Sequence, residues 1–310
     1  MSNTTMRAIQ AHDYGGPEVL VLEQAPRPEP NDDQVLIRLK AAGINPTDWK
    51  NRAGYYKQFM PLEFPWTPGV DGSGVVEAVG ANVTMLKVGD EVYGIVSGGY
   101  AEYALALANE VQPKPAGITF EQAAALPLGA LTAWGAVIDA ARVEKGQRVL
   151  VHGAAGGVGS YAVQLAKWKG AHVTGTASAD NLESVRSLGT DDVIDYNATR
   201  FETVLKDLDA VIDTVGGNLP ERSFQVIRPG GILVMIAARL AEDAGKAQNI
   251  RAVTVGRASA DKLKRVSELI EAKQLEPVVG PVFPLADVRQ AHERSQTGHG
   301  RGRIILHITD

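Results

Sequence analysis

The chain has 310 residues, of which 45% are hydrophobic, and a formal net charge of −5. Its length suggests two domains, and its negative charge argues against nucleic acid as the main partner. It has no cysteine, which excludes disulfides, thiol catalysis and cysteine-ligated metal. No apolar run reaches the roughly 18 residues that span a bilayer, and the N-terminus lacks the apolar core of a signal peptide. We therefore expect a cytoplasmic protein without a membrane or nucleic-acid partner.

The first 118 residues contain several short strand patterns separated by turns. Apolar and polar residues alternate over 35–41, which predicts a half-buried strand. A turn at 43–48 leads into a short helix that begins near Asp48. Further strand patterns follow at 70–80, 88–94 and 100–105. Short strands at this close spacing predict a small β-barrel-like domain.

Residues 51–68 are rich in aromatic residues and proline, including Tyr55 and Tyr56. Such a segment is irregular in backbone but still packs. It forms either one wall of an apolar substrate cleft or a loop held in place by aromatic burial. The sequence favours neither interpretation.

The most informative stretch is 147–169, where a run of Val and Leu ends in glycines and helical spacing begins at Val158. The glycines read Gly153-x-x-Gly156-x-x-Gly159. A helix N-terminus offers free N–H groups and a partial positive charge, and glycine lets a phosphate approach the backbone. A strand, a glycine-rich turn and a helix in this order predict a dinucleotide site. The alternative is a turn that is glycine-rich only for tight packing.

A helical region precedes this turn, and strand and helix patterns alternate after it. Thr119 and Gln122 have capping-box spacing, and the helical region 120–141 should break at Pro127 and Gly129. Alternation after the turn predicts a parallel, doubly wound sheet. An amphipathic helix at 261–273 and a last strand at 303–308 follow, and the strand should return to the first domain. The predicted strands are 171–176, 192–195, 210–213, 231–236 and 252–255, and the predicted helices are 181–188, 200–206 and 220–227.

The end of the second strand of this fold, which is the first strand after the turn, indicates which cofactor is bound. An acidic residue about 20 positions past the glycines holds the ribose hydroxyls of NAD, but this chain has Ser178 in that region. Without a carboxylate there is no repulsion against a 2′-phosphate, so the sequence favours NADPH. NADH stays possible because Asp180 and Glu183 lie close by. Tyr196 is among the nearest residues that could reach the phosphate.

The whole chain resembles the medium-chain dehydrogenase/reductase superfamily, and most of all its zinc-independent, zeta-crystallin-like quinone oxidoreductase branch. The resemblance implies a Rossmann NADP-binding domain at 119–257 and a GroES-like β-barrel catalytic domain at 1–118 and 258–310. The motifs that carry it occur in the family's order, at 43–48, 68–74, 88–90, 99–103, 126–133, 152–159, 189–196, 213–217 and 300–303.

The resemblance also implies that no metal is bound. The zinc-dependent members would carry Cys at the position of Asn45 and His at that of Val70. Neither is present, and the six histidines form no His-x-x-x-His pair. Hydride transfer would then proceed without a Lewis acid.

The same resemblance assigns residues to the site. Asn45 matches a residue near the nicotinamide, Lys50 one that reaches the cofactor ribose, and Thr132 one that lines the nicotinamide side. Taken from the residues alone, Asn45 could hold its turn, Lys50 could be a surface charge, and Tyr55 could pack rather than donate a proton. The family's lysine after the second strand is replaced by Asn181 and Leu182. The other expected cofactor-binding residues are Gly153, Gly156, Gly157, Val158, Gly159, Ser178, Tyr196 and Val215.

The expected function is hydride transfer from NADPH to a quinone. One alternative is an NADPH-dependent reductase of enone or 2-alkenal double bonds, since pocket shape alone separates these substrates. The other is a non-catalytic NADPH-binding sensor. The edge strand at 252–255 could pair across a two-fold axis, as in related family members, so we expect a homodimer.

Overall fold

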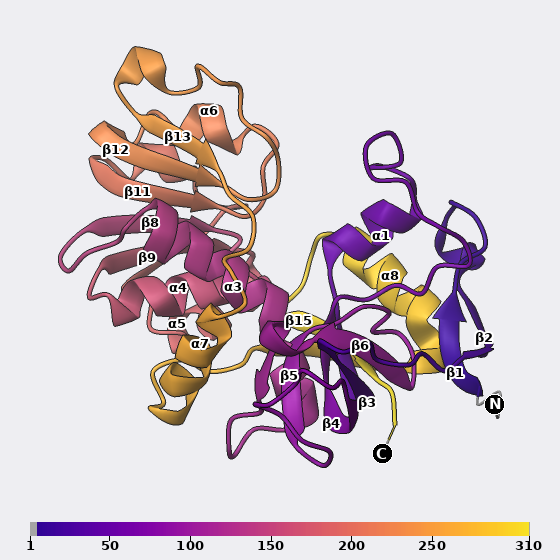
Figure 1. Ribbon diagram of the computed structural model, residues 1–310. Helices are drawn as coiled ribbons and strands as arrows, with labels where there is room; N and C mark the ends of the chain where they lie inside the picture. The colour runs from indigo at the N-terminus through magenta and orange to yellow at the C-terminus, as the bar shows by residue number, and fades with distance from the viewer. Residues whose placement is uncertain (1–4, 310) are drawn as a thin grey trace.

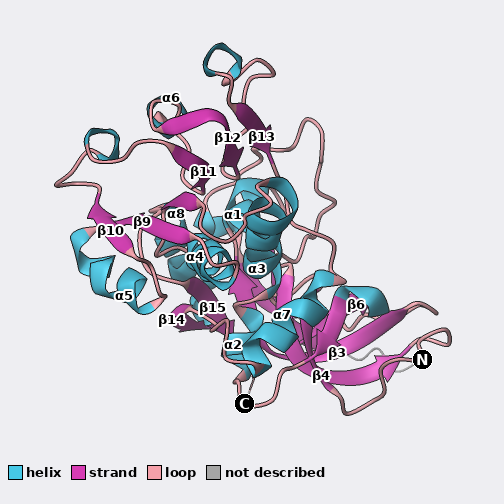
Figure 2. Cartoon of the chain, turned by 90° about the vertical axis from the view of Figure 1, so that its left-hand side faces the viewer, coloured by secondary structure: helices cyan, strands magenta, loops and turns pink. Residues whose placement is uncertain are grey.

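Residues 5–309, which the computed structural model describes, form two lobes that meet along one side (Figure 1). The expectation about a signal peptide lies partly outside these residues. Seen from the side in Figure 2, strands β9 to β13 stay together in one lobe, and strands β3, β4 and β6 stay together in the other. Between residues 5 and 309, no helix has the length and apolar character of a membrane span.

One lobe contains a six-stranded parallel sheet with the order β10-β9-β8-β11-β12-β13. The order runs outward from β8 in both directions, which confirms the predicted doubly wound sheet. Val149, Leu150 and Val151 of β8 are all buried, as expected for a strand covered on both faces. The strands are β8 (Arg148–His152), β9 (His172–Ala177), β10 (Asp192–Asp195), β11 (Leu208–Asp213), β12 (Ile227–Met235) and β13 (Arg251–Thr254).

The helices that follow residue 118 begin where the sequence provides caps. Thr119 caps its helix by accepting a hydrogen bond from the N–H of Gln122, as predicted. Pro127 stands at the first position of the next helix, where its missing N–H costs nothing. The helices of this lobe are α3 (Pro127–Trp134), a wider π-helical continuation of α3 (Gly135–Ala140), α4 (Gly159–Trp168), α5 (Leu182–Ser187), α6 (Leu219–Ser223) and α7 (Lys262–Glu271). The helix before them, α2 (Phe120–Ala124), packs on the other lobe, where Ala124 is buried with Ala41 and Ile305.

The other lobe is built on a seven-stranded, mainly antiparallel sheet with the order β14-β15-β3-β4-β5-β7, in which β6 also pairs with β3. The last strand, β15, pairs antiparallel with β3, so the chain returns to its first lobe as predicted. The elements are β1 (Thr5–Gln10), β2 (Val21–Pro26), β3 (Gln34–Ile44), α1 (Pro46–Arg52), β4 (Asp71–Val79), β5 (Glu91–Ile95), β6 (Tyr103–Leu107), β7 (Val111–Pro113), β14 (Val279–Pro284), α8 (Val288–Gln296) and β15 (Arg303–His307).

Three local predictions are wrong. The expected helix at 200–206 is a single 3-10 turn, Phe201–Thr203, because the stretch is short and ends at Asp207 in a left-handed conformation. The expected helix at 220–227 ends at Ser223, and Ile227 already belongs to β12. Gly129 does not break its helix, because glycine keeps its backbone N–H and only weakens a helix. Glycine is required there because an added Cβ would lie 2.5 Å from Arg303 Nη2.

The predicted boundary between the domains near residue 257 stays a prediction. Leu263 and Val266 of α7 are buried in the same hydrophobic cluster as Val149 and Val151 of the parallel sheet. Tyr93 of the other lobe donates to the backbone oxygen of Leu263 at 3.1 Å. We therefore propose that the second crossing between the lobes lies after α7.

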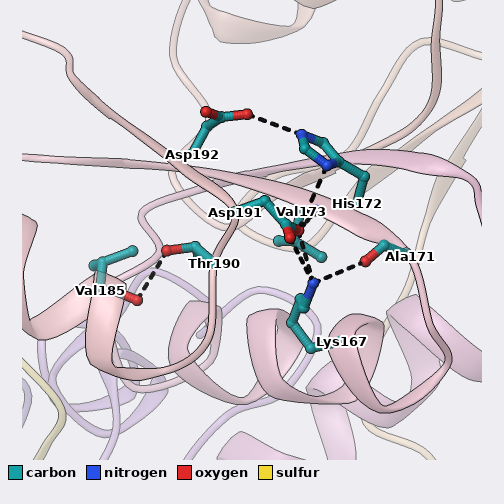
Figure 3. A network of polar contacts seen from close by, with 8 residues as sticks. All are labelled: Lys167, Ala171, His172, Val173, Val185, Thr190, Asp191 and Asp192. Atoms are coloured by element: carbon teal, nitrogen blue, oxygen red, sulfur yellow. Dashed lines mark hydrogen bonds and ion pairs between the residues drawn. The ribbon is translucent and has the colours of Figure 1, made fainter.

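A polar network fixes the amino end of β9 and β10 against α4 (Figure 3). The ammonium of Lys167 lies 2.8 and 2.7 Å from the two carboxylate oxygens of Asp191. Asp191 also accepts the N–H of Val173 at 2.7 Å. Partial burial opposes ionisation, but these hydrogen bonds outweigh it and lower the pKa of Asp191. The neighbouring Asp192 meets only the ring of His172 in this network.

Asp191→Asn should therefore lower the free energy of unfolding by about 1–2 kcal/mol at neutral pH. Because the pKa of Asp191 is lower in the folded protein, its contribution is present at neutral pH and disappears as the pH falls below its ordinary value of 3.8. Urea unfolding at pH 7 and pH 3 measures this. The matched control is Asp192→Asn, whose side chain is 63% exposed and should change stability little. An equal effect of both variants would contradict the interpretation.

Candidate active site

The glycine-rich turn connects β8 to α4 at the carboxyl edge of the parallel sheet. Gly153 has a φ of +68°, which only glycine adopts readily. A Cβ on Gly159 would lie 2.1 Å from the carbonyl oxygen of Gly153, so this close approach requires glycine at position 159. The N–H of Ala154 donates to Thr176 of β9 at 3.0 Å. Val158 is the residue that precedes α4, and the first N–H groups of that helix therefore lie at the turn.

Three more of the predicted cofactor residues come to the same edge, because each follows one of the parallel strands. Ser178 follows β9 and accepts a hydrogen bond from Asn181 Nδ2 at 2.9 Å. Tyr196 follows β10 and is 47% exposed, and Val215 is two residues past β11 and 56% exposed. The exposed edge beside the turn thus has the shape and position at which doubly wound sheets bind dinucleotides.

A buried polar cluster lies where the lobe of the antiparallel sheet meets this turn. It consists of Asn45, at the end of β3, Asp71, the first residue of β4, and Arg303, the first residue of β15. All three are at most 4% exposed. Asn45 Nδ2 donates to Asp71 Oδ2 at 2.9 Å, and Arg303 Nη1 donates to Asn45 Oδ1. Asp71 Oδ1 accepts the N–H of Leu128, in the first turn of α3, at 2.9 Å. The cluster therefore joins the two lobes.

The guanidinium of Arg303 has donors left over for an anion. Its Nε and Nη2 atoms are buried and have no hydrogen-bond partner among the described residues. It lies against the turn, since a Cβ on Gly157 would be 3.2 Å from its Cζ and Nε atoms. Gly302 donates to the carbonyl of Ala155 at 2.8 Å, which holds the strand against the turn. Orphaned donors beside a glycine-rich turn fit the diphosphate of a dinucleotide.

Asp48 lies beneath this cluster at the start of α1. Its Oδ2 accepts both the N–H of Asn45 at 2.8 Å and the hydroxyl of Tyr100 at 2.7 Å. Complete burial raises the pKa of Asp48 to about 7, with a smaller contribution from the charge of Asp71. The two hydrogen bonds and the charge of Arg303 oppose this rise without cancelling it.

The remaining predicted residues lie nearby but outside the cluster. Thr132 is buried in α3, four residues past Leu128. Lys50 is on α1, with its ammonium 5.6 Å from the centre of the Trp49 ring. Tyr55 follows α1, stands edge-on to Trp49 and is 65% exposed. No group of three or more His, Cys, Asp or Glu side chains that could hold a metal ion occurs within residues 5–309.

Comparison with known proteins agrees with this geometry. Profiles of two families match the chain: "Alcohol dehydrogenase GroES-like domain" over residues 31–116 and "Zinc-binding dehydrogenase" over residues 188–306. The quinone oxidoreductase of Pongo abelii is 35% identical over 97% of this chain and 97% of its own length. The chloroplastic NADPH-dependent alkenal/one oxidoreductase of Arabidopsis thaliana is 37% identical, over 97% of this chain and 79% of its own.

The solved structure of the quinone oxidoreductase from Coxiella burnetii superposes on the chain with a TM-score of 0.90, at 34% identity, covering 99% of this chain and all of the other. The chain belongs to the quinone oxidoreductase family of medium-chain dehydrogenases/reductases. It is therefore an oxidoreductase with a nicotinamide cofactor, and the predicted pairing of a GroES-like domain with a Rossmann domain is confirmed.

Three residues of this quinone oxidoreductase site received no role from the sequence. Asp71, Arg303 and Tyr100 each lie inside a recognised motif, but only the fold brings them to Asn45 and Asp48. One signal was available: Asp71 and Arg303 are charged residues at the first positions of strands that are mostly apolar. A charge in such a position requires a buried partner.

We expect Gly157→Ala to weaken cofactor binding about tenfold, equivalent to 1.4 kcal/mol. The added Cβ would push on the Arg303 guanidinium and fill the space over the turn. Fluorescence titration with NADPH and with NADH measures the dissociation constants. Gly256→Ala is the control, because a Cβ there meets nothing within 4 Å. Unchanged affinity in Gly157→Ala would contradict a diphosphate at this position.

Asp48→Asn should remove a pH dependence of stability. The folded protein keeps a proton on Asp48 between pH 3.8 and about 7, whereas the unfolded chain releases it. The free energy of unfolding therefore falls as the pH rises through this window, by on the order of 4 kcal/mol. Asparagine keeps both hydrogen bonds through one oxygen and carries no charge.

Urea unfolding at pH 5 and pH 8 compares this variant with the unmodified protein. The Asp48→Asn variant should be the more stable protein at pH 8, and the advantage should shrink at pH 5. The exposed Asp192→Asn variant serves as the control for a changed net charge. Parallel pH curves for Asp48→Asn and the unmodified protein would show that Asp48 does not titrate in this window.

Proposed function

We propose that the protein transfers a hydride from NADPH to a quinone. The observation that carries this proposal is the buried Asn45 amide, held by Arg303 beside the glycine-rich turn. The nicotinamide supplies the hydride when the cofactor is bound. Relatives named quinone oxidoreductase, at 34–35% identity over nearly the whole chain, support the choice of acceptor.

In this proposal the chain's own residues bind the cofactor, orient it against the acceptor and polarise the acceptor oxygen. The turn from Gly153 to Gly159, together with the free Nε and Nη2 of Arg303, holds the diphosphate. Asn45 would lie near the nicotinamide, Lys50 would reach the ribose, and Thr132 would line the nicotinamide side. An N–H of Asn45 meets the negative charge that develops on the acceptor oxygen. Asn45 and Val70 provide neither thiolate nor imidazole, so the proposed reaction needs no zinc.

The preference for NADPH over NADH rests on the end of β9. Ser178 and Asn181 bond to each other there, and neither carries a negative charge that would repel a 2′-phosphate. Tyr196 is half exposed on the neighbouring strand end and can reach that phosphate. Arg200 is a weaker candidate, because its guanidinium is bonded to Glu202 at 2.9 Å. The relative from Arabidopsis thaliana whose name includes NADPH adds support.

Reduction of an enone or alkenal double bond is the second candidate function. The relative with "alkenal/one oxidoreductase" in its name is 37% identical to this chain, which is similar to the quinone oxidoreductases. The same donor and the same cofactor geometry would serve both acceptors. We also propose a homodimer, because β13 is an edge strand of the described sheet and could pair with its copy across a two-fold axis. The proposed compartment is the cytoplasm.

Oxidation of NADPH, followed by absorbance with a quinone, an enal and no acceptor in parallel reactions, tests the proposal. We expect fast turnover with the quinone, slower turnover with NADH in place of NADPH, and no change when a chelator is added. Turnover with the enal alone would favour the second candidate. Tight NADPH binding without any turnover would instead favour a sensor, and loss of activity with the chelator would contradict the zinc-independent reaction.

A further inference from the structure

We propose that Asp71 and Arg303 are positioning residues, which together fix the orientation of the Asn45 amide and so aim one of its N–H groups at the acceptor. The proposal rests on the function proposed above. We call the three residues the amide clamp.

The clamp depends on the two different ends of an amide. The oxygen Oδ1 only accepts hydrogen bonds, and the Nδ2 group only donates them. In this structure Oδ1 of Asn45 accepts a hydrogen bond from the guanidinium of Arg303, and Nδ2 donates one to the carboxylate of Asp71. A rotation of the amide by half a turn would bring the NH₂ against the cation and the oxygen against the anion. Both hydrogen bonds would be lost in a buried place, so the observed orientation is strongly preferred.

The amide lies between a buried anion and a buried cation that do not pair directly. Within residues 5–309 no ion pair joins Asp71 to Arg303, although both are buried and each bonds to the same Asn45. Two buried charges of opposite sign that served stability alone would be expected to meet. Placing a neutral amide between them gives that amide a fixed direction.

Both ends of the clamp are anchored outside Asn45. The second carboxylate oxygen of Asp71 accepts the N–H of Leu128 at 2.9 Å. The guanidinium of Arg303 lies between Gly157 of the turn and Gly129 of α3. Neither charged group can rotate away without losing a contact to the other lobe.

One N–H of the amide is left for the reaction. A primary amide has two N–H bonds on its nitrogen, and one of these goes to Asp71. Its second N–H forms no hydrogen bond to another described residue. Because Arg303 holds Oδ1 in place, the direction of this second N–H is also fixed. A preorganised donor stabilises developing charge better than one that must rotate first.

The decisive experiment is a double-mutant cycle between positions 45 and 71. Asp71→Asn presents one oxygen to two donors, so it should disturb the amide of Asn45 and lower kcat about 10- to 100-fold, with little change in cofactor affinity. In the background of Asn45→Ala, the same Asp71→Asn change should alter kcat less than about twofold, because the group it positions is absent. Equal losses in both backgrounds would contradict action through Asn45.

An exchange of the two residues tests the geometry independently of activity. In Asn45→Asp with Asp71→Asn, the new carboxylate can accept from Arg303 and from the new amide, whose oxygen can accept from Leu128. Every hydrogen bond of the clamp is then made again. Each single variant should lower the melting temperature, and the exchange should recover most of the loss. The exchanged protein should still have a low kcat, because no side-chain N–H remains at position 45.

Ser73→Ala is the control for a change on the same strand. Ser73 is buried, and its hydroxyl has no partner among the described residues, so kcat and melting temperature should stay near those of the unmodified protein. A folded Asp71→Asn with full kcat would overturn the proposal. If the unmodified protein oxidises NADPH neither with a quinone nor with an enal, the proposed function fails, and recovery of stability in the exchanged protein still decides whether the clamp exists.

Discussion

The burial of one arginine between the two lobes determines which groups can pack and form hydrogen bonds around it. Arg303 begins the last strand of one lobe, yet its guanidinium packs on Gly157 and Gly129 of the other. A buried guanidinium is costly unless its donors are met. Only the donor to Asn45 is met by a side chain in the cluster, and the two orphaned nitrogen atoms lie beside a turn built for phosphate. These donors and the turn therefore offer hydrogen bonds that fit an anion such as a diphosphate.

Charge balance explains the different roles of the two buried carboxylates. Asp48 and Asp71 both lie close enough to Arg303 for its charge to act on their pKa values, so one cation faces two acids. Burial raises both pKa values. Asp71 has hydrogen bonds from a side chain and from the other lobe. Asp48 binds the backbone of Asn45 and the hydroxyl of Tyr100. The protein can therefore lower the net charge of the cluster by keeping a proton on Asp48, without disturbing the amide of Asn45.

The sequence predicted the parts of the molecule that depend on local pattern. The glycine turn, the strands of the parallel sheet and the capped helix at Thr119 all follow from residues close together in the chain. The helix expected at 200–206 was wrong because helical spacing over a few residues did not outweigh a left-handed residue, Asp207, at its end. The clamp could not be predicted from local pattern at all. Arg303 and Asn45 are 258 positions apart, and only the pairing of β15 with β3 brings them together.

The clamp also bears on why an amide can stand where zinc-dependent members of the superfamily have a metal ligand. A thiolate binds a cation, which then polarises the substrate oxygen. An amide can meet that oxygen directly, but only if its N–H points the right way before the charge develops. A free asparagine would have to be ordered in each turnover, whereas Asn45 is ordered in advance by a cation on its oxygen and an anion on its nitrogen. The two buried charges are thus placed where they orient a neutral donor.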